Sequence, residues 1–224
     1  MGPRKTTTRE RLITTAAELF RRQGYAQTGV NQIIQEANAT SGSFYHFFPA
    51  KEDLLMAVVD HIAEVFESEI FAPAADRADE PVEELFAVLE LYRQHLADGG
   101  FTFASPTAGF SAEVSEIHPQ VRARLAEIFA AWTGRIDKLL RDAGDRLSPA
   151  VDRAAVAELV VCAMEGAVLA ARLNRSLRPF DAVIDQLGNY VGLLEPQTAA
   201  VAAGPVTRRA VRATPQQNAD WRSW

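Results

Sequence analysis

Apolar residues recur every three or four positions along most of the chain, the spacing that places them on one side of an α-helix. The first such stripe predicts a helix that begins near Thr7 and ends at Gly24. Thr7 and Glu10 have the spacing of a capping box, and a glycine commonly ends a helix. The stripe consists of Leu12, Ile13, Ala16, Leu19 and Phe20. No stretch alternates apolar and polar residues as a strand would, so the predicted fold class is all-α.

Two short helices are predicted next, over about residues 30–37 and about Thr40–Phe47. Short helices joined by so few residues are typical of a helix-turn-helix. At about 100° per residue, Phe44, Phe47 and Phe48 share one side of the third helix. We therefore expect these rings to anchor the helix and its polar side to face outward.

The expected outer side of the third helix carries small or hydrogen-bonding residues, namely Ser41, Gly42, Ser43, Tyr45 and His46. Small side chains let a helix backbone approach base edges, and Tyr45 and His46 can donate hydrogen bonds to phosphate oxygens. Predicted helix N-termini at Thr28, Thr40 and Lys51 would present N–H groups to anions. The competing interpretation is a connector helix whose polar side only faces water.

The residues from Thr28 to Leu55, TGVNQIIQEANATSGSFYHFFPAKEDLL, resemble the DNA-binding domain of TetR-family transcriptional regulators. The resemblance includes the LFRRQGY end of the first helix, the SGSFYHFF recognition helix and the PAKEDLL start of the fourth. It implies that Thr28 caps the second helix and touches phosphate. It also implies that the recognition helix starts, nearest the bases, at Thr40, Ser41, Gly42 and Ser43. The residues implied to bind the DNA backbone are Tyr45, His46 and Lys51, and those implied to form a flexible basic arm are Arg4, Lys5 and Arg9.

Two positions depart from the family pattern. A lysine is common where Ser41 stands, so one phosphate contact is expected to be missing. Ala50 replaces the usual Ser-like cap of the fourth helix and cannot accept a hydrogen bond from the first turn. The missing lysine near Ser41 keeps open a ligand carrier that has lost DNA binding.

The remaining pattern predicts a larger helical unit. Its helices are expected at about Lys51–Ile70, Val82–Leu96, Val121–Leu140, Ser148–Asn174 and Pro179–Leu194. Pro73 and the polar residues up to Glu80 are interpreted as a connection, and the segment from Phe101 to His118 as irregular. We expect a DNA-binding domain at 1–50, an effector-binding and dimerisation domain at 51–195, and a disordered tail at 196–224, which is rich in Ala, Thr, Pro and Gln.

The helix expected at about Ser148–Asn174 is apolar except for a stripe of Glu158, Glu165 and Arg172. Two glutamates are costly inside a bilayer, so a soluble buried helix is favoured over a membrane span. Burial on most sides favours a subunit interface. The TetR resemblance likewise implies a homodimer through the last two helices, about 148–194. The alternative is the central helix of a monomer.

The resemblance also implies a chamber for a small apolar or aromatic effector that releases DNA. Its candidate lining residues are His95, Phe103, Phe110, Trp132, Cys162 and Met164. For each aromatic residue, packing in the core is the competing interpretation. Cys162 is interpreted as a small buried apolar group without a nucleophilic role.

Charge divides the chain unevenly around a formal net charge of −6. Residues 1–50 hold 6 Lys and Arg against 3 Asp and Glu, whereas residues 51–195 hold 13 against 25. This difference suggests that the N-terminal end meets a polyanion. With 1 Cys, 4 His and no glycine-rich phosphate loop, an enzyme is disfavoured, and we expect no catalytic residue, metal or cofactor.

These observations and the resemblance together predict a homodimeric repressor that binds a near-palindromic DNA operator and responds to a small molecule. The polar N-terminus does not have the pattern of a secretory signal, so a cytoplasmic location is expected.

Overall fold

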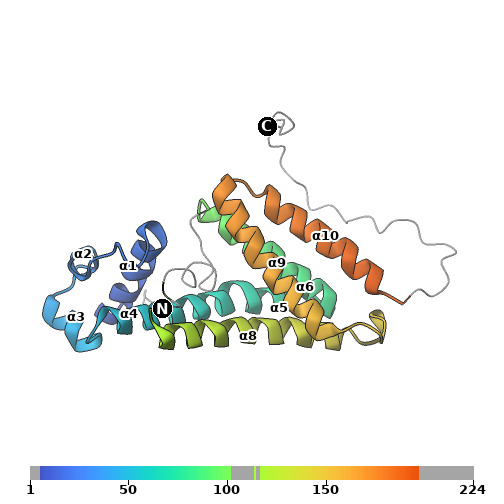
Figure 1. Ribbon diagram of the computed structural model, residues 1–224, viewed down its shortest axis with the longest axis horizontal. Coiled ribbons are helices and arrows are strands. Elements are labelled where there is room, and N and C mark those ends of the chain that lie inside the picture. Colours follow the sequence, from blue (N-terminus) through green and yellow to red (C-terminus); the bar gives the residue numbers. More distant parts are fainter. Residues whose placement is uncertain (1–5, 102–113, 115–116, 197–224) are drawn as a thin grey trace, which may run out of the picture.

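The computed structural model describes residues 6–101, 114 and 117–196, and all regular secondary structure in these residues is helical. The predicted all-α class is thereby confirmed. The first three helices gather at one end of the molecule and the remaining helices form the rest (Figure 1). We call the first three helices the head and the helices from Lys51 onward the body. The basic tail beyond residue 196 lies outside the described residues.

The head consists of α1 (Thr8–Gln23), α2 (Val30–Glu36) and α3 (Ser41–Phe47). The predicted capping box is present, because the Glu10 N–H donates to the Thr7 hydroxyl at 3.2 Å and the Thr7 N–H donates to Glu10 Oε2 at 2.7 Å. Gly24 ends α1 with a φ of 87°, a conformation that favours glycine. All five stripe residues of α1 are buried, as expected.

The body contains α4 (Lys51–Phe66), α5 (Ala72–Arg77), α6 (Pro81–Asp98), α8 (Pro119–Asp142), α9 (Arg153–Asn174) and α10 (Arg178–Leu194). A π-helical turn, Glu67–Phe71, joins α4 to α5 without a break. The prediction that a non-helical connection starts at Pro73 is therefore wrong, because residues up to Arg77 are helical. Proline fits the first turn of a helix because no intrahelical N–H bond is required there, and Pro73 lies in the first turn of α5.

Helices α4 and α8 run side by side in the same direction, away from the head (Figure 1). Three polar contacts join α8 and His118, the residue before it, to α4 and the π-helical turn that follows α4. His118 Nδ1 lies 3.2 Å from Glu52 Oε1, Arg124 Nε lies 2.7 Å from Asp60 Oδ1, and Arg135 pairs with Glu67. The hydrogen bond to Asp60, followed by that to Glu127, raises the pKa of Arg124, so this guanidinium stays charged. Helix α4 begins at the head, and contacts from its start to its end hold it against α8 of the body.

Helix α9 begins at Arg153, later than predicted, because the Asp152 carboxylate caps it by accepting the Ala155 N–H at 3.1 Å. The helix is long and apolar enough to span a membrane by length and composition, yet it packs between α8 and α10. Within this single chain, 44% of the most apolar 18-residue stretch of α9 is buried, so burial on most sides is not reached by the chain alone. Its outward side presents Leu159, Leu169 and Leu173.

Candidate nucleic-acid interface

Helix α3 begins with a reciprocal cap between two hydroxyl residues. The Thr40 hydroxyl accepts the Ser43 N–H, and the Ser43 hydroxyl oxygen accepts the Thr40 N–H, each at 3.1 Å. Such a cap satisfies N–H groups that a helix start leaves unpaired. Thr40 and Ser43 therefore hold the start of α3 in place, and Ser41 and Gly42 between them are exposed.

Two aromatic rings hold α3 against the head from behind. Phe44 is 0% exposed and Phe48 is 2% exposed, and their ring centroids lie 6.0 Å apart. Phe47, the third predicted anchor, is instead 37% exposed, and this part of the prediction is wrong. Its position lies at the edge of the predicted arc, where the ring contacts the exposed His46 on one side and the buried Phe48 on the other.

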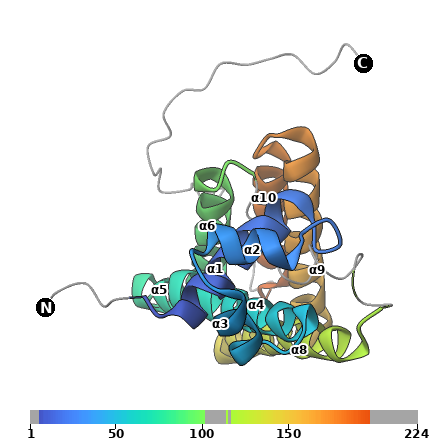
Figure 2. The same ribbon diagram turned by 90° about the vertical axis from the view of Figure 1, so that its left-hand side faces the viewer.

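The outward side of α3 carries Tyr45, which is 56% exposed, and His46, which is also exposed. The Tyr45 ring packs edge-on against the buried Phe44, with 5.1 Å between the ring centroids. These two side chains and the exposed Ser41 and Gly42 lie on one polar surface, as predicted. Figure 2 views the molecule from this end.

Thr28 does not cap α2, which corrects the prediction. Gly29 occupies the cap position without a side-chain hydrogen bond, and the Thr28 hydroxyl donates to the Gly24 carbonyl at 2.6 Å. Thr28 is 1% exposed, so a phosphate contact by its side chain would require the local structure to open. Its observed role is to close the loop between α1 and α2.

The start of α4 also differs in detail from the prediction. The Lys51 ammonium donates to the Tyr25 carbonyl and lies 4.0 Å from the centroid of the Tyr25 ring, so it is directed toward the protein. Ala50 provides no side-chain cap, as expected, but Asp53 Oδ2 accepts the Ala50 N–H at 2.8 Å. A phosphate contact by Lys51 would require the ammonium to leave Tyr25.

The structure describes one of the three residues that were expected to form a flexible basic arm. Arg4 and Lys5 lie outside the described residues, whereas Arg9 belongs to α1, with its guanidinium 5.6 Å from the Phe48 ring centroid. Arg9 is therefore part of a helix rather than of a flexible arm. Its exposed charge lies beside the base of α3.

A tight turn joins α2 to α3, and Asn38 makes the turn with a φ of 48°. Asparagine is one of the few residues that adopt this conformation at low cost. The second of two short helices is thus anchored from behind and exposes a polar side. These features define the class: a DNA-binding protein of the helix-turn-helix type.

Comparison with known proteins places the chain within this class. Residues 12–58 match the family of bacterial regulatory proteins called tetR, and residues 81–186 match the C-terminal domain of LmrA/YxaF-like transcriptional regulators. An uncharacterised HTH-type transcriptional regulator of Mycobacterium tuberculosis is 34% identical over 190 residues, which cover 82% of this chain and 93% of that protein. The HTH-type transcriptional repressor DhaR of a Mycobacterium species is 25% identical over 179 residues, which cover 79% and 88% of the two chains.

The fold agrees with these matches. The crystal structure of regulatory protein TetR from Rhodobacter sphaeroides superposes with a TM-score of 0.76 at 26% identity, covering 82% of this chain and 98% of that one. The chain belongs to the TetR family of transcriptional regulators. It is a DNA-binding regulator and not an enzyme.

The effector residues predicted in the body fall in different places. Trp132 is 6% exposed and Met164 is 3% exposed, so both face the interior. His95 is partly exposed and its Nε2 lies 2.6 Å from Glu69 Oε2. Cys162 is exposed, which overturns the expectation of a buried thiol. Phe103 and Phe110 lie outside the described residues.

An aromatic cluster in the body was missed by the sequence analysis. Phe66 stacks on Trp132 with 4.5 Å between ring centroids, and Tyr92 contacts Phe66 at 5.0 Å and Phe180 at 5.6 Å. The Tyr92 hydroxyl donates to Glu165 Oε1 at 3.5 Å. These residues come from α4, α6, α8, α9 and α10, so their convergence follows from the fold and not from sequence spacing.

Glu165 is the only buried Asp, Glu, Lys or Arg side chain among the described residues, with 9% exposure. The predicted polar stripe of α9 is therefore divided: Glu158 is exposed, whereas Glu165 faces the aromatic cluster. A buried carboxylate requires hydrogen-bonding partners, and Tyr92 is one of them. The sequence signal was present, since Glu165 interrupts a long apolar run, but it was interpreted only as part of a polar stripe with Glu158 and Arg172.

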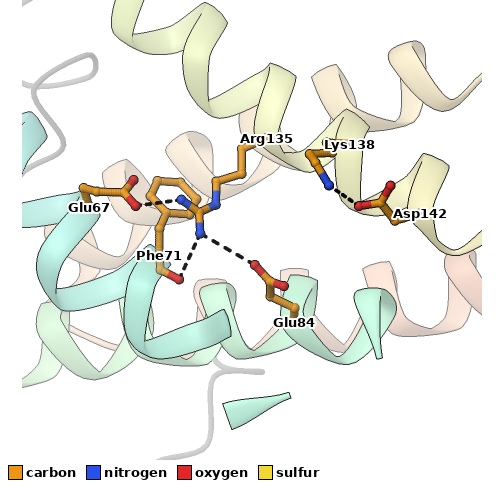
Figure 3. Close-up of polar contacts among 6 residues, drawn as sticks. All are labelled: Glu67, Phe71, Glu84, Arg135, Lys138 and Asp142. Atoms are coloured by element: carbon orange, nitrogen blue, oxygen red, sulfur yellow. Dashed lines mark hydrogen bonds and ion pairs between the residues drawn. The ribbon is translucent and has the colours of Figure 1, made fainter. Parts of the chain in front are cut away.

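The end of α4 is held by Arg135 of α8 (Figure 3). Its guanidinium lies 2.7 Å from Glu67 Oε1 and 3.7 Å from Glu84 Oε1, and it donates to the Phe71 carbonyl at 3.3 Å. The Phe71 ring centroid lies 4.9 Å from the same guanidinium. One side chain thus connects α6, α8 and the π-helical turn, directly after Phe66 of the aromatic cluster.

Proposed function

We propose that the protein is a repressor that binds a near-palindromic operator as a homodimer and leaves it when a small molecule binds in the body. The observation that carries the DNA part is the exposed polar side of α3, which is anchored by Phe44 and Phe48. The name of the relative DhaR, a transcriptional repressor, supports repression. Location in the cytoplasm, where the operator is, belongs to the same proposal.

The proposed DNA contacts divide by chemistry. Ser41 and Gly42 are small and exposed, so they allow the start of α3 to approach base edges in the major groove. Tyr45 and His46 point to the same side and would donate hydrogen bonds to phosphate oxygens. Thr40 and Ser43 would act mainly by fixing the helix, because their hydroxyls already form the cap.

The proposed dimer interface is the apolar side of α9 and α10. Five of the eight exposed large apolar side chains in the described part of the chain lie there: Leu159, Leu169, Leu173, Tyr190 and Leu193. Exposed apolar side chains gathered on two packed helices favour a site of protein association. A second copy is the proposed occupant, because homodimer interfaces are more apolar than other surfaces. Two α3 helices would then meet half-sites about 34–36 Å apart.

The proposed effector site is the aromatic cluster around Phe66, Tyr92 and Trp132. Its lining would accept an apolar or aromatic molecule, and Glu165 would accept a hydrogen bond from it. Phe66 is the last residue of α4, whose first residue, Lys51, touches the head. An effector that displaces Phe66 would therefore shift α4 and change the spacing of the two heads. Typical couplings of this kind are about 1–3 kcal/mol.

The test is a gel-shift titration of the Tyr45→Phe/His46→Ala variant on the operator. We expect affinity to fall by about tenfold, since two phosphate hydrogen bonds are lost. The control is His61→Ala, which removes an imidazole from the body at a position outside every proposed contact surface. Unchanged affinity in the first variant would remove Tyr45 and His46 from the contact surface.

Salt dependence separates a repressor from a ligand carrier that has lost DNA binding. Phosphate contacts release counterions, so affinity for the operator should fall steeply as salt rises. A flat response over about 50–200 mM salt would favour the carrier.

A further inference from the structure

A groove lies where the C-terminal ends of α1 and α9 approach each other, outside the aromatic cluster. It is lined by four arginines, Arg21, Arg22, Arg172 and Arg175, and by three apolar residues, Phe101, Leu169 and Leu173. Its volume is about 530 Å³, enough for a small organic molecule. The groove thus joins a helix of the head to a helix of the body.

The positive charge of this groove is largely unbalanced. Arg21 forms an ion pair with Glu18 of its own helix. Arg22, Arg172 and Arg175 form no ion pair with any carboxylate in the part of the chain that the structure describes. This excess stands out because residues 51–195, which contribute two of the arginines, are strongly acidic. Clustered like charges repel unless an anion lies between them.

A basic residue near a helix C-terminus is favourable by itself, because the helix dipole is negative there. That explains each pair of arginines on its own helix. It does not explain why two such ends, from α1 and α9, converge on one groove with no acidic residue among its lining residues.

The backbone at the groove adopts a conformation that favours glycine. Arg175 has a φ of 50° and Phe101 a φ of 64°, and they are two of the three non-glycine residues with positive φ among those described. Arg175 occupies the end of α9, where glycine is usual. Its guanidinium lies 5.7 Å from the Phe101 ring centroid. The strained backbone places an arginine beside an aromatic ring at the rim of the groove.

We propose that this groove binds a small organic anion that carries a phosphate or carboxylate group next to an apolar group. The planar guanidinium matches either oxyanion with paired hydrogen bonds. The apolar group would rest on Leu169 and Leu173. An anion that bridges Arg22 of α1 and Arg172 of α9 would hold the head against the body and thereby regulate operator binding from a second site.

The groove opens at the edge of the proposed dimer interface, because Leu169 and Leu173 also belong to the apolar side of α9. Ligand binding is therefore to be measured on the full chain in its native oligomeric state. That state is verified for each variant by sedimentation.

Isothermal titration calorimetry with phenyl phosphate tests the proposal. We expect saturable binding of one molecule per protomer, tighter than that of inorganic phosphate, which lacks the apolar group. Titration with benzoate shows whether a carboxylate serves as well as a phosphate. The variant Arg22→Gln/Arg172→Gln should bind phenyl phosphate at least about tenfold more weakly. The control Arg122→Gln/Lys138→Gln removes the same charge from exposed positions of α8 and should leave the affinity unchanged.

A second variant separates binding from folding. Arg175→Gly removes a guanidinium and at the same time relieves the positive-φ backbone, so the melting temperature should not fall while anion affinity does. The proposal is overturned if no probe binds saturably, or if Arg22→Gln/Arg172→Gln binds phenyl phosphate as the unmodified protein does. It is also overturned if that variant loses DNA affinity while no anion binds, because the groove would then be a DNA contact.

Discussion

Helices α3 and α9 both expose a surface to solvent, but the two surfaces have opposite chemistry. Helix α3 is short, and its outward side carries hydroxyl, imidazole and phenol groups around Ser41 and Tyr45. Helix α9 is three times as long, and its outward side carries Leu159, Leu169 and Leu173. The first surface is well solvated when it is free, whereas the second is not.

This difference indicates two kinds of partner. A contact that must form and dissociate repeatedly suits polar groups, because water replaces the partner at little cost. A permanent contact suits apolar groups, because exposing an apolar surface to water is unfavourable and a permanent partner keeps that surface covered. This difference is the reason for proposing that α3 contacts DNA and that α9 contacts a second copy of the chain.

The largest effect is expected at the anchor of α3. Phe44→Ala should destabilise the head by about 3–5 kcal/mol, because it leaves a cavity at a site that is 0% exposed. Chemical denaturation measures the loss, and operator binding should disappear with it. Phe47→Ala is the matched control, since this ring is 37% exposed and should cost much less. Equal losses in both variants would contradict the anchoring geometry.

The next effect concerns the apolar side of α9 and α10. Leu159→Glu/Leu193→Glu would place unpaired charges in the proposed interface and should weaken the dimer by about 3 kcal/mol or more. Analytical ultracentrifugation should then detect monomers with unchanged helicity. Ile117→Glu is the control, because Ile117 is 69% exposed and lies outside α9 and α10. An intact dimer in the double variant would exclude this surface as the interface.

A smaller effect is expected at the cap of α3. Thr40→Ala removes the acceptor of the Ser43 N–H and should cost about 1 kcal/mol of stability. Operator affinity should fall as well, because the start of α3 is no longer held. Ser41→Ala, one position further, should leave denaturation unchanged. If Ser41→Ala costs as much stability as Thr40→Ala, the cap is not what orders this helix.

The smallest effect is a gain. Ala50→Ser supplies the hydroxyl that the start of α4 lacks and should add about 0.5–1 kcal/mol of stability. The urea midpoint should rise, while the affinity for DNA changes little. A midpoint that stays the same would indicate that Asp53 alone satisfies the cap.

Local sequence signals predicted the head well. The stripe from Leu12 to Phe20 and the Thr7–Glu10 cap depend on residues within one helix, and both are present. The errors came where the tertiary structure decides. Thr28 has the right residue type for a cap, yet its hydroxyl bonds back to Gly24. Likewise, Phe47 lies at the edge of the aromatic side of α3, and the packing of the helix against the head leaves this ring partly exposed.

The body was predicted less completely, again for physical reasons. A π-helical turn has no distinctive sequence pattern, so Pro73 was interpreted as a break. The leucines on the outward side of α9 were interpreted as buried. An apolar pattern in the sequence does not distinguish burial inside one chain from burial between two chains. The aromatic cluster of Phe66, Tyr92 and Trp132 joins three helices, and sequence spacing alone does not show such convergence.

The most direct test of the assignment of α3 and α9 is selection of bound duplexes from a random DNA pool, followed by sequencing. We expect enrichment of an inverted repeat whose half-sites lie about one helical turn apart or a multiple of it. Enrichment of a single unpaired half-site, or of no sequence at all, would contradict a dimer that reads DNA through two α3 helices.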